Sequence, residues 1–322
     1  MSSVPQTINR STENNMGEKE IQSQLPQLQA ARAQFLALVE ELRPQLHRYC
    51  ARMTGSVTEG EDIVQDTVAH AYYELGQLNE LPAMRAWLFR IAHNRALDHL
   101  RRYERRMVEA LEEDHDMVDE NALTPEDKLA REQALAAAVS RFMELAPAQR
   151  SSVILKDVLD YPLEEISALL DLSVAAVKSA LHRGRERLRA LVAESAAASK
   201  PAAPRPVSAE LARYVALFNA RDWDGVRAML AEDVRVDVVA RVRKSGAAGR
   251  VYFTTYDSLH NWRFAPAWLE EREVIAVYRP DAAEPAYIID LDWQNGKITS
   301  IRDYVFVPYI TRDANVRPAA ES

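Results

Sequence analysis

The chain has 322 residues, a formal net charge of -8 at pH 7 and a single cysteine, Cys50. This length leaves room for two or three domains, each with a core of its own. One cysteine excludes an internal disulfide, and the lack of a signal peptide or of an apolar run near ~18 residues predicts a soluble, cytoplasmic chain without membrane contact.

Residues 1–27 are rich in Ser, Thr, Asn, Gln and Glu and hold few large apolar groups. Such a segment cannot bury enough apolar surface to offset the entropy of ordering, so we expect a disordered tail. From residue 28 to residue 106 apolar side chains recur at helical spacing, which predicts an all-helical domain. Thr58 as N-cap and Glu61 three residues later form a capping box, so one helix is expected to begin there.

Charge is segregated in the next part of the chain. Residues 85–106, in a helix expected from Met84, contain seven arginines and two acids, whereas nine acids and no Lys or Arg lie between Glu109 and Asp127. A stripe of arginines can meet phosphates locally even though the whole chain is acidic. Residues 107–127 are therefore predicted to form an acidic linker.

A second helical domain is predicted over residues 128–194. Within it, "LEEISALLDLSVAAVKSALHRGRERLRAL" places a polar step between two apolar-periodic segments, with Ser173 as the cap of the second helix. A second helix with exposed donors in its N-terminal half is what a helix-turn-helix inserts into the major groove. A solvated helical hairpin is the alternative interpretation.

The composition changes after an Ala/Pro/Ser linker at residues 195–206. Residues 207–312 combine two short helical segments with runs of β-branched and aromatic residues, and residues 313–322 form a tail. The sequence QNGK at residues 294–297 is a strong hairpin signal. These features predict an α+β domain with an antiparallel sheet.

The arginine-rich segment "MRAWLFRIAHNRALDHLRRYERR" also interleaves aromatic side chains and histidines with its positive charges. Aromatic and basic groups together suit unstacked, single-stranded bases. Core packing explains Trp87 and Leu88 better than base stacking does. It does not explain the polar set Asn94, Asp98, His99, Arg101 and Arg102.

Four ordered blocks resemble bacterial sigma factors of the extracytoplasmic-function (ECF) class over about residues 34–192. They are "EDIVQDTVAHAYYEL", "AWLFRIAHNRALDHLRR", the acidic linker and "YPLEEISALLDLSVAAVKSALHRGRERL". The resemblance implies a promoter-recognition subunit, not an enzyme, with core RNA polymerase and promoter DNA as partners and with no cofactor, metal or catalytic residue. Residues 28–106 would bind the polymerase clamp and melt the minus-10 element, and residues 128–194 would read the minus-35 element.

The resemblance also implies roles for individual residues by their position. Core-polymerase binding falls on Asp62, Gln65 and Asp66. Minus-10 DNA binding falls on Asn94, Asp98, His99, Arg101 and Arg102, and minus-35 DNA binding falls on Lys178, Ser179, His182 and Arg183. Ala180 stands where the family commonly has an arginine, which puts the ion pair or phosphate contact of that arginine in doubt.

The C-terminal domain resembles the SnoaL-like family, a cone-shaped α+β fold with a curved antiparallel sheet around an apolar pocket. The resemblance rests on "YVALFNARDWDGVRAMLAEDVRVDV" and "WQNGKITSIRDYVF". It implies regulation of the helical domains, with a small-molecule ligand in the pocket as one option. Enzymes of this family use a pocket carboxylate as general base, which would nominate Asp233, Asp237, Asp290 or Asp292. Surface or strand-edge acids are the alternative for each.

Two further hypotheses remain open. A polymerase-independent helix-turn-helix regulator would bind specific duplex DNA tightly, but this leaves the first two blocks unexplained. An isomerase-type or cyclase-type enzyme with a DNA-binding module lacks an assembled catalytic constellation. For the sigma-factor hypothesis, the acidic linker is expected to mask the basic stripes until docking, so neutralising Glu112, Glu113, Asp114 and Asp116 would change promoter binding by the isolated protein.

Overall fold

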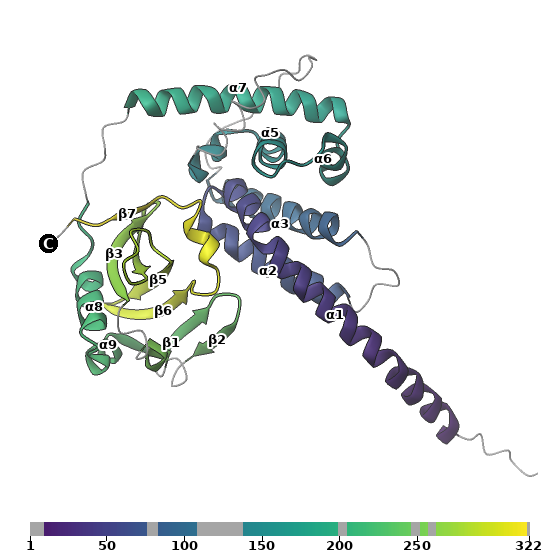
Figure 1. The fold of residues 1–322 in the computed structure, drawn as a ribbon, viewed down its shortest axis with the longest axis horizontal. Coiled ribbons are helices and arrows are strands. Elements are labelled where there is room, and N and C mark those ends of the chain that lie inside the picture. The colour runs from purple at the N-terminus through teal and green to yellow at the C-terminus, as the bar shows by residue number, and fades with distance from the viewer. Residues whose placement is uncertain are drawn as a thin grey trace, which may run out of the picture.

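The computed structural model describes residues 10–75, 83–107, 138–198, 205–245, 252–256 and 262–320. Figure 1 shows two groups of helices beside a curved sheet with two short helices of its own. The predicted fold class, two helical parts followed by an α+β domain, is confirmed. The acidic segment from Glu109 to Asp127, and with it the masking prediction, lies outside the described residues.

Three helices make up the first helical part: α1 (Arg10–Thr54), α2 (Val57–Leu75) and α3 (Met84–Met107). Helix α1 extends away from the packed body (Figure 1) and includes residues 10–27 of the segment expected to be disordered. Among its described side chains, burial begins at Phe35. A helix anchored there can continue outward through a Gln- and Glu-rich sequence, because these residues have favourable helix propensity.

Helix α2 begins earlier than the sequence predicts. The Ser56 hydroxyl accepts a hydrogen bond from the Glu59 amide at 3.4 Å, so the predicted capping box starting at Thr58 is wrong. The predicted reciprocal partner, Glu61, is fully buried and accepts a hydrogen bond from the Tyr309 hydroxyl at 2.9 Å. The Glu61 carboxylate therefore binds Tyr309, far along the chain, instead of the backbone amide that a capping box would offer it.

The second helical part contains a helix-turn-helix. Its elements are η1 (Val139–Glu144), α5 (Pro147–Val153), the π-helical turn η2 (Ile154–Val158), α6 (Leu163–Leu170) and α7 (Val174–Ala198). Asp171 ends α6 in the left-handed region with φ 55°, and the Ser173 hydroxyl accepts from the Ala176 amide at 3.1 Å. The predicted cap at Ser173 is thus confirmed, and the polar step reverses the chain between the two helices.

The two helical parts share one apolar core that draws on α1, α2, α3, α5, α6 and α7. Phe89 of α3 packs edge-on against Tyr161, with ring centroids 5.3 Å apart. Arg150 of α5 is buried and donates to the carbonyl oxygen of Met53, in the last turn of α1, at 2.5 Å. A cation is favourable at a helix C-terminus, so this contact also holds the two helical parts together.

The C-terminal domain is built on a seven-stranded sheet in the order β2-β1-β6-β5-β4-β3-β7. Its strands are β1 (Leu230–Val238), β2 (Val242–Ser245), β3 (Arg263–Leu269), β4 (Arg272–Tyr278), β5 (Tyr287–Gln294), β6 (Lys297–Asp303) and β7 (Val316–Pro318). Its helical elements are α8 (Ala209–Asn219), α9 (Trp223–Ala228), η3 (Tyr252–Tyr256) and η4 (Pro308–Thr311).

This sheet differs from the expected antiparallel sheet at one place, because β1 and β6 pair in parallel. The chain between them passes through β2 to β5, which is long enough for the crossover that a parallel pair needs. The hairpin predicted at residues 294–297 is confirmed: Asn295 and Gly296 have φ values of 52° and 71°, the positive values of a type I′ turn. Strands β2, β3 and β7 were not predicted as separate strands.

The two faces of the sheet have different partners. One face packs with α8, α9 and η3 around an aromatic core that includes Phe218, Tyr256 and Phe264. The other face belongs to a second apolar cluster, which contains Ala51 and Val57 of the first helical part. The C-terminal domain therefore packs against the helices through the outer face of its sheet.

Candidate functional site

The N-terminal half of α7 presents the residues expected to read duplex DNA. Lys178 and His182 are exposed, and Ser179 and Arg183 are half-buried beside them. Ala180 is buried, so the position where the family commonly has arginine faces the core in this chain. The structure therefore brings the four expected residues together on the accessible side of the second helix of the helix-turn-helix.

A neighbouring arginine of α7 has a different role from these four. The Arg185 guanidinium binds the buried Asp157 carboxylate through Nε at 2.9 Å and Nη2 at 2.5 Å. A bidentate, charge-assisted pair of this kind fixes both side chains. Not every arginine of α7 is thus available to bind phosphates. Arg185 instead anchors α7 on η2.

The residues expected to capture single-stranded DNA lie along α3. Asn94, Asp98, Arg101 and Arg102 are exposed, whereas His99 is half-buried and its Nε2 lies 3.2 Å from Glu59 Oε2.

Asn94 also faces the second helical part. It lines a cavity of about 450 Å³ with Arg90 and His93 on one side and Ala168 to Asp171 of α6 on the other. Arg90 donates to the Ala168 carbonyl oxygen at 3.2 Å. In this arrangement α6 of the helix-turn-helix lies next to Asn94, the first residue of the set expected to bind minus-10 DNA.

The residues expected to bind the polymerase lie on α2, and two of them, Asp62 and Gln65, lie next to residues of the C-terminal domain. Asp62 forms an ion pair with Arg302 of β6. Next to it, the buried Glu61 pairs with Arg43 and accepts from the Tyr309 hydroxyl at 2.9 Å. Arg43 also donates to the Tyr309 hydroxyl at 2.8 Å. The C-terminal domain thus contacts the first of the three expected residues directly.

Further polar contacts extend this interface. The Glu270 carboxylate accepts from the Val57 amide at 2.9 Å and so caps the start of α2 from the C-terminal domain. Asp313 pairs with Arg48 at 3.2 Å and with Arg52 at 3.0 Å. Burial raises the pKa of Asp313, but the two arginines outweigh burial and hold its pKa below the ordinary value. We call the contacts of Glu270, Arg302, Tyr309 and Asp313 with α1 and α2 the docking interface.

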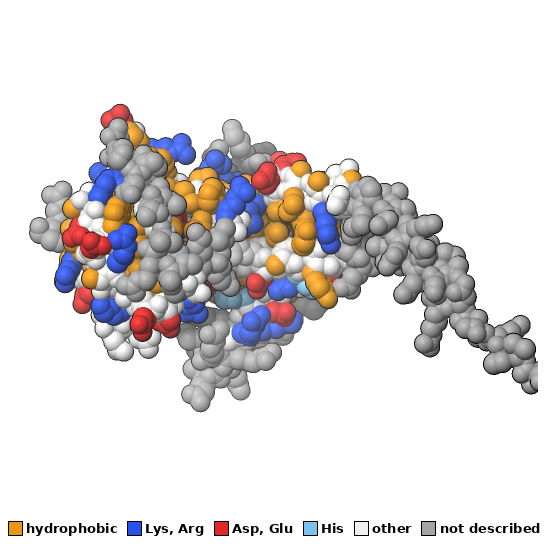
Figure 2. Space-filling view, turned by 90° about the horizontal axis from the view of Figure 1, so that it is seen from below, with side chains coloured by type: hydrophobic (Ala, Val, Ile, Leu, Met, Phe, Trp, Pro, Cys, Tyr) orange, Lys and Arg blue, Asp and Glu red, His pale blue; other side chains and the backbone are white. Residues whose placement is uncertain are grey.

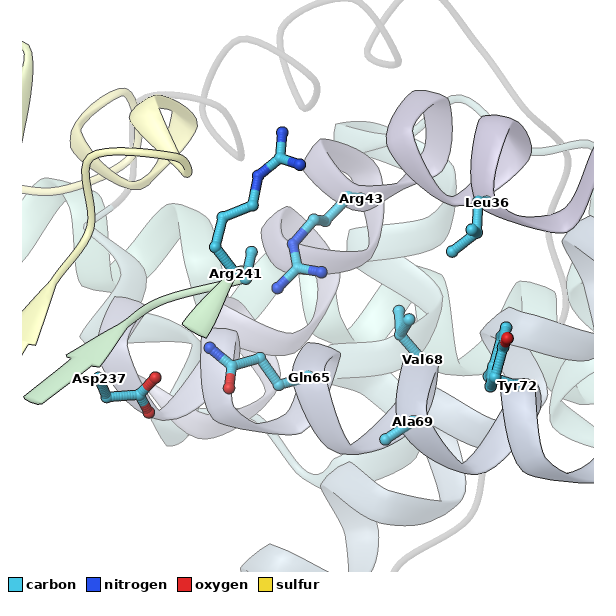
Figure 3. Close-up of a pocket in the computed structure, with 9 residues that line it drawn as sticks. Leu36, Arg43, Gln65, Val68, Ala69, Tyr72, Asp237 and Arg241 are labelled. Carbon is cyan, nitrogen blue, oxygen red and sulfur yellow. The ribbon is translucent and has the colours of Figure 1, made fainter. Parts of the chain in front are cut away.

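A groove of about 610 Å³ borders the docking interface. Figure 3 shows Arg43 and Arg241 at one end of it and Leu36, Val68 and Tyr72 at the other. Gln65, the second expected polymerase-binding residue, lines the groove together with Asp237 of β1. The third, Asp66, is exposed and lies 3.7 Å from Arg95.

Beside this groove the surface is partly apolar. Leu36, Tyr72 and Tyr73 of the helical part are large hydrophobic side chains with 50%, 39% and 73% of their surface exposed. Figure 2 shows hydrophobic side chains interspersed with Lys and Arg on the face of the helical part that it presents. Exposed apolar side chains rimmed by charges are typical of surfaces that bind another protein.

The four carboxylates nominated as a general base do not face the aromatic core. Their neighbours Val234, Val236, Ile289 and Leu291 belong to that core, and strand side chains alternate between the two faces. Asp290 instead lies 3.2 Å from Arg272. Asp233, Asp237 and Asp292 likewise occupy the outer positions of β1 and β5.

The carboxylate that does face the aromatic core is Asp303, which the sequence reasoning missed. It is 1% exposed and accepts hydrogen bonds from the hydroxyls of Tyr252 and Tyr256. Its position could have been predicted from the sequence, because Asp303 follows the core residue Ile301 of β6 by two positions and strand residues two apart share a face. Among the described residues, no group of His, Cys, Asp or Glu could hold a metal ion, and no helix is long and apolar enough to cross a membrane.

Comparisons with known proteins agree with the helical part of this architecture. A family model for Sigma-70 region 2 matches residues 38–106, and one for Sigma-70 region 4 matches residues 137–188. The chain is 34% identical over 216 residues to the ECF RNA polymerase sigma factor SigG of Mycobacterium tuberculosis, covering 60% of this chain and 58% of SigG. It is 31% identical over 153 residues to the RNA polymerase sigma factor CarQ of Myxococcus xanthus, covering 47% of this chain and 84% of CarQ.

The chain thus spans less than two thirds of SigG but more than two thirds of CarQ. Among solved structures, the crystal structure of the extracytoplasmic function sigma factor SigJ of Mycobacterium tuberculosis is 21% identical. That match covers 83% of this chain and 95% of SigJ with a TM-score of 0.33. Because this TM-score is low, the family assignment depends on the family models and on the sequence relatives.

Proposed function

We propose that this chain, which belongs to the ECF family of RNA polymerase sigma factors, directs RNA polymerase to specific promoters and initiates transcription there. This family consists of transcription initiation factors and not of enzymes. The proposed partners are core RNA polymerase and promoter DNA, and the proposed location is the cytoplasm. The two Sigma-70 matches enclose all twelve residues proposed to bind them.

One observation carries the proposal: a helix-turn-helix with an accessible basic second helix is joined in one chain to the arginine-rich helix α3. Lys178 and His182 are exposed on α7, and Arg101 and Arg102 are exposed on α3. The first pair suits a duplex groove, and the second pair suits the phosphates of a separated strand. A polymerase-independent regulator would need only the first of these surfaces.

We further propose that the C-terminal domain inhibits the helical domains. Its support is the docking interface, in which Arg302 pairs with Asp62 and Tyr309 bonds to Glu61. An acidic surface that is already paired with an arginine is unavailable to a basic partner, so docking and polymerase binding would compete. The short linker keeps the C-terminal domain at a high effective concentration.

Run-off transcription with core RNA polymerase tests both proposals. The full chain is compared with a version ending at Ala203, on a promoter selected from genomic fragments. We expect initiation that requires polymerase, and more transcript from the shortened chain. Initiation from neither version would reject the sigma-factor proposal, and equal output from both would reject inhibition. The variant Lys178→Ala with Arg183→Ala is the control, because it should fail on the promoter while still binding polymerase.

A small-molecule ligand of the C-terminal domain is a finer proposal. Its support is the aromatic interior around Phe218, Tyr256 and Phe264, which resembles the apolar lining of ligand sites. Thermal unfolding of the full chain with a panel of aromatic compounds tests it, since a ligand that binds only the folded state raises Tm.

A further inference from the structure

Asp303 is a buried carboxylate at the end of β6, between the aromatic core and the docking interface. It is 1% exposed, and its neighbours on the inner side are the hydroxyls of Tyr252 and Tyr256. Both hydroxyls donate to Oδ2. Because a buried carboxylate without donors would be costly, these two hydrogen bonds are needed to keep it in place.

The second oxygen of the same carboxylate holds the turn that follows β6. Oδ1 accepts from the Val305 amide at 3.0 Å, which is the geometry of a side-chain-stabilised turn. The turn continues through hydrogen bonds from the Val307 amide to the Tyr304 carbonyl oxygen at 3.0 Å and from the Ile310 amide to the Val307 carbonyl oxygen at 3.0 Å. It leads directly into η4, which carries Tyr309 of the docking interface.

The residues on either side of Asp303 face the helices. Side chains alternate along β6, so Arg302 and Tyr304 lie on the face opposite to Asp303. Arg302 pairs with Asp62, and Tyr304 belongs to the apolar cluster that contains Val57. One residue therefore joins the interior of the C-terminal domain to the three side chains, Arg302, Tyr304 and Tyr309, that meet the helical part.

We propose that Asp303 is a positioning residue that, through Tyr252 and Tyr256 on one side and the turn at Val305 on the other, holds Arg302 and Tyr309 in register with Asp62 and Glu61. Loss of the tyrosine hydrogen bonds would loosen the turn and weaken docking without removing any residue of the interface. The effect on polymerase binding rests on the proposed function, whereas the effect on docking does not.

Burial supports this role. It removes the Asp303 carboxylate from water and raises its pKa, while the tyrosine hydroxyls and the Val305 amide act in the opposite direction. The tyrosines come from η3, which is otherwise packed by aromatic contacts such as that between Tyr256 and Phe264 at a centroid distance of 5.6 Å. Aromatic packing thus fixes Tyr252 and Tyr256. The turn after Asp303, by contrast, depends on the carboxylate for its position.

The test measures docking in the full chain without polymerase, as amide hydrogen exchange of α2. The variants are Asp303→Asn, which keeps the shape of the side chain but leaves one acceptor oxygen for the two hydroxyls and the Val305 amide, and the milder Tyr256→Phe. The matched control is Tyr214→Phe, because the Tyr214 hydroxyl is buried in the same core and has no hydrogen-bond partner among the residues that the structure describes. Thermal unfolding checks that each variant is folded.

We expect exchange in α2 to rise roughly threefold or more in Asp303→Asn and less in Tyr256→Phe, and to be unchanged in Tyr214→Phe. In an Arg302→Ala background Asp303→Asn should add little, because the contact it positions is already absent. Unchanged exchange in folded Asp303→Asn, or an equal increase in the Arg302→Ala background, would overturn the positioning role.

Polymerase affinity of the same variants separates this inference from the proposed function. Faster exchange together with tighter polymerase binding supports both. Faster exchange with unchanged polymerase binding would keep the positioning role and reject competition between docking and polymerase.

Discussion

Arg302 and Asp62 lie 240 positions apart in the chain and form one ion pair at the docking interface. The Asp62 side chain is half exposed, so water screens the pair and its contribution is modest, about 1 kcal/mol or less. Under the proposed role of Asp62, the pair competes with polymerase binding and contributes little to the stability of the fold. At the scale of residues, we therefore expect polymerase binding to depend on whether the Asp62 carboxylate is paired with Arg302.

Replacing Arg302 by alanine should raise the affinity of the full chain for core RNA polymerase by up to about fivefold, because one competing contact of about 1 kcal/mol or less is lost. The measurement is a binding titration with labelled polymerase. Arg227→Ala is the matched control, since Arg227 pairs with Asp224 at 2.7 Å on α9, away from the docking interface. The chain ending at Ala203 lacks residue 302 and the whole docking interface. Its affinity for polymerase therefore sets the upper limit for the variant.

His93 predicts a pH dependence of stability. Its Nδ1 lies 2.6 Å from the Tyr49 hydroxyl, and burial lowers its pKa from 6.5 to about 4. The unfolded chain then binds a proton more readily than the folded chain, so the stabilisation is present above about pH 6.5 and is lost as the pH falls toward about 4. After allowance for the partial exposure of the ring, roughly 2 kcal/mol is involved.

Urea unfolding at pH 7 and pH 5 measures this effect. The loss of unfolding free energy between the two pH values should be smaller in His93→Gln than in the unmodified chain. The half-buried histidine His70, whose Nε2 lies 3.0 Å from Glu74 Oε1, provides the control substitution, His70→Gln. An identical pH dependence in all three proteins would show that His93 does not titrate as its burial implies.

Helix α7 shows at the scale of elements how one segment separates structural from functional side chains. Val177, Leu181 and Leu188 lie in the core and Arg185 anchors the helix to Asp157. Apart from the buried Ala180, the remaining side chains of its first two turns are exposed or half-buried. Amphipathic spacing thus fixes the packed face, and the residues proposed to contact DNA lie outside that face.

Two substitutions in this element should have separable effects. Ser173→Ala removes the hydroxyl that accepts from the Ala176 amide and should cost about 1 kcal/mol of unfolding free energy. Lys178→Ala should leave stability unchanged and weaken binding to minus-35 duplex DNA. Urea unfolding and a duplex-binding titration at fixed salt distinguish them. Equal loss of stability in both variants would contradict the assignment of Lys178 to the accessible face.

At the scale of the whole molecule, the chain adopts a closed arrangement. The two helical parts share a core, with Phe89 against Tyr161 and Arg150 on the end of α1, and residues of α6 line one cavity together with Asn94. The C-terminal domain adds the docking interface on the other side of α2. Binding to polymerase and to two promoter elements would require these contacts to open, so activation is expected to be a domain rearrangement.

Hydrogen exchange measured with and without core polymerase tests this rearrangement. The segment from Tyr304 to Asp313, which carries the contacts of Tyr309 and Asp313, should lose protection when polymerase binds, because its partners on α1 and α2 are taken over. Strands β4 and β5 should keep their protection, since they lie within the sheet. Retained protection of residues 304–313 in the complex would mean that polymerase binds without displacing the C-terminal domain.

The sequence by itself determined the elements that depend on local chemistry. Helix α6, the cap at Ser173 and the turn at Asn295 and Gly296 follow from spacing, capping and positive φ, which neighbouring residues decide. The family, too, was readable from ordered blocks. The exposure of Lys178 and His182 on one helix was therefore predictable.

Only the tertiary structure decided the features that join distant parts of the chain. The parallel pairing of β1 with β6, the capture of Glu61 by Tyr309 instead of a local capping box, and the inward position of Asp303 all depend on partners tens to hundreds of residues away. Local sequence patterns do not identify such partners. An acidic residue has the same secondary-structure propensity whether its hydrogen-bond donor lies three residues away or in another domain. The docking of the C-terminal domain on α2 is a contact of this kind.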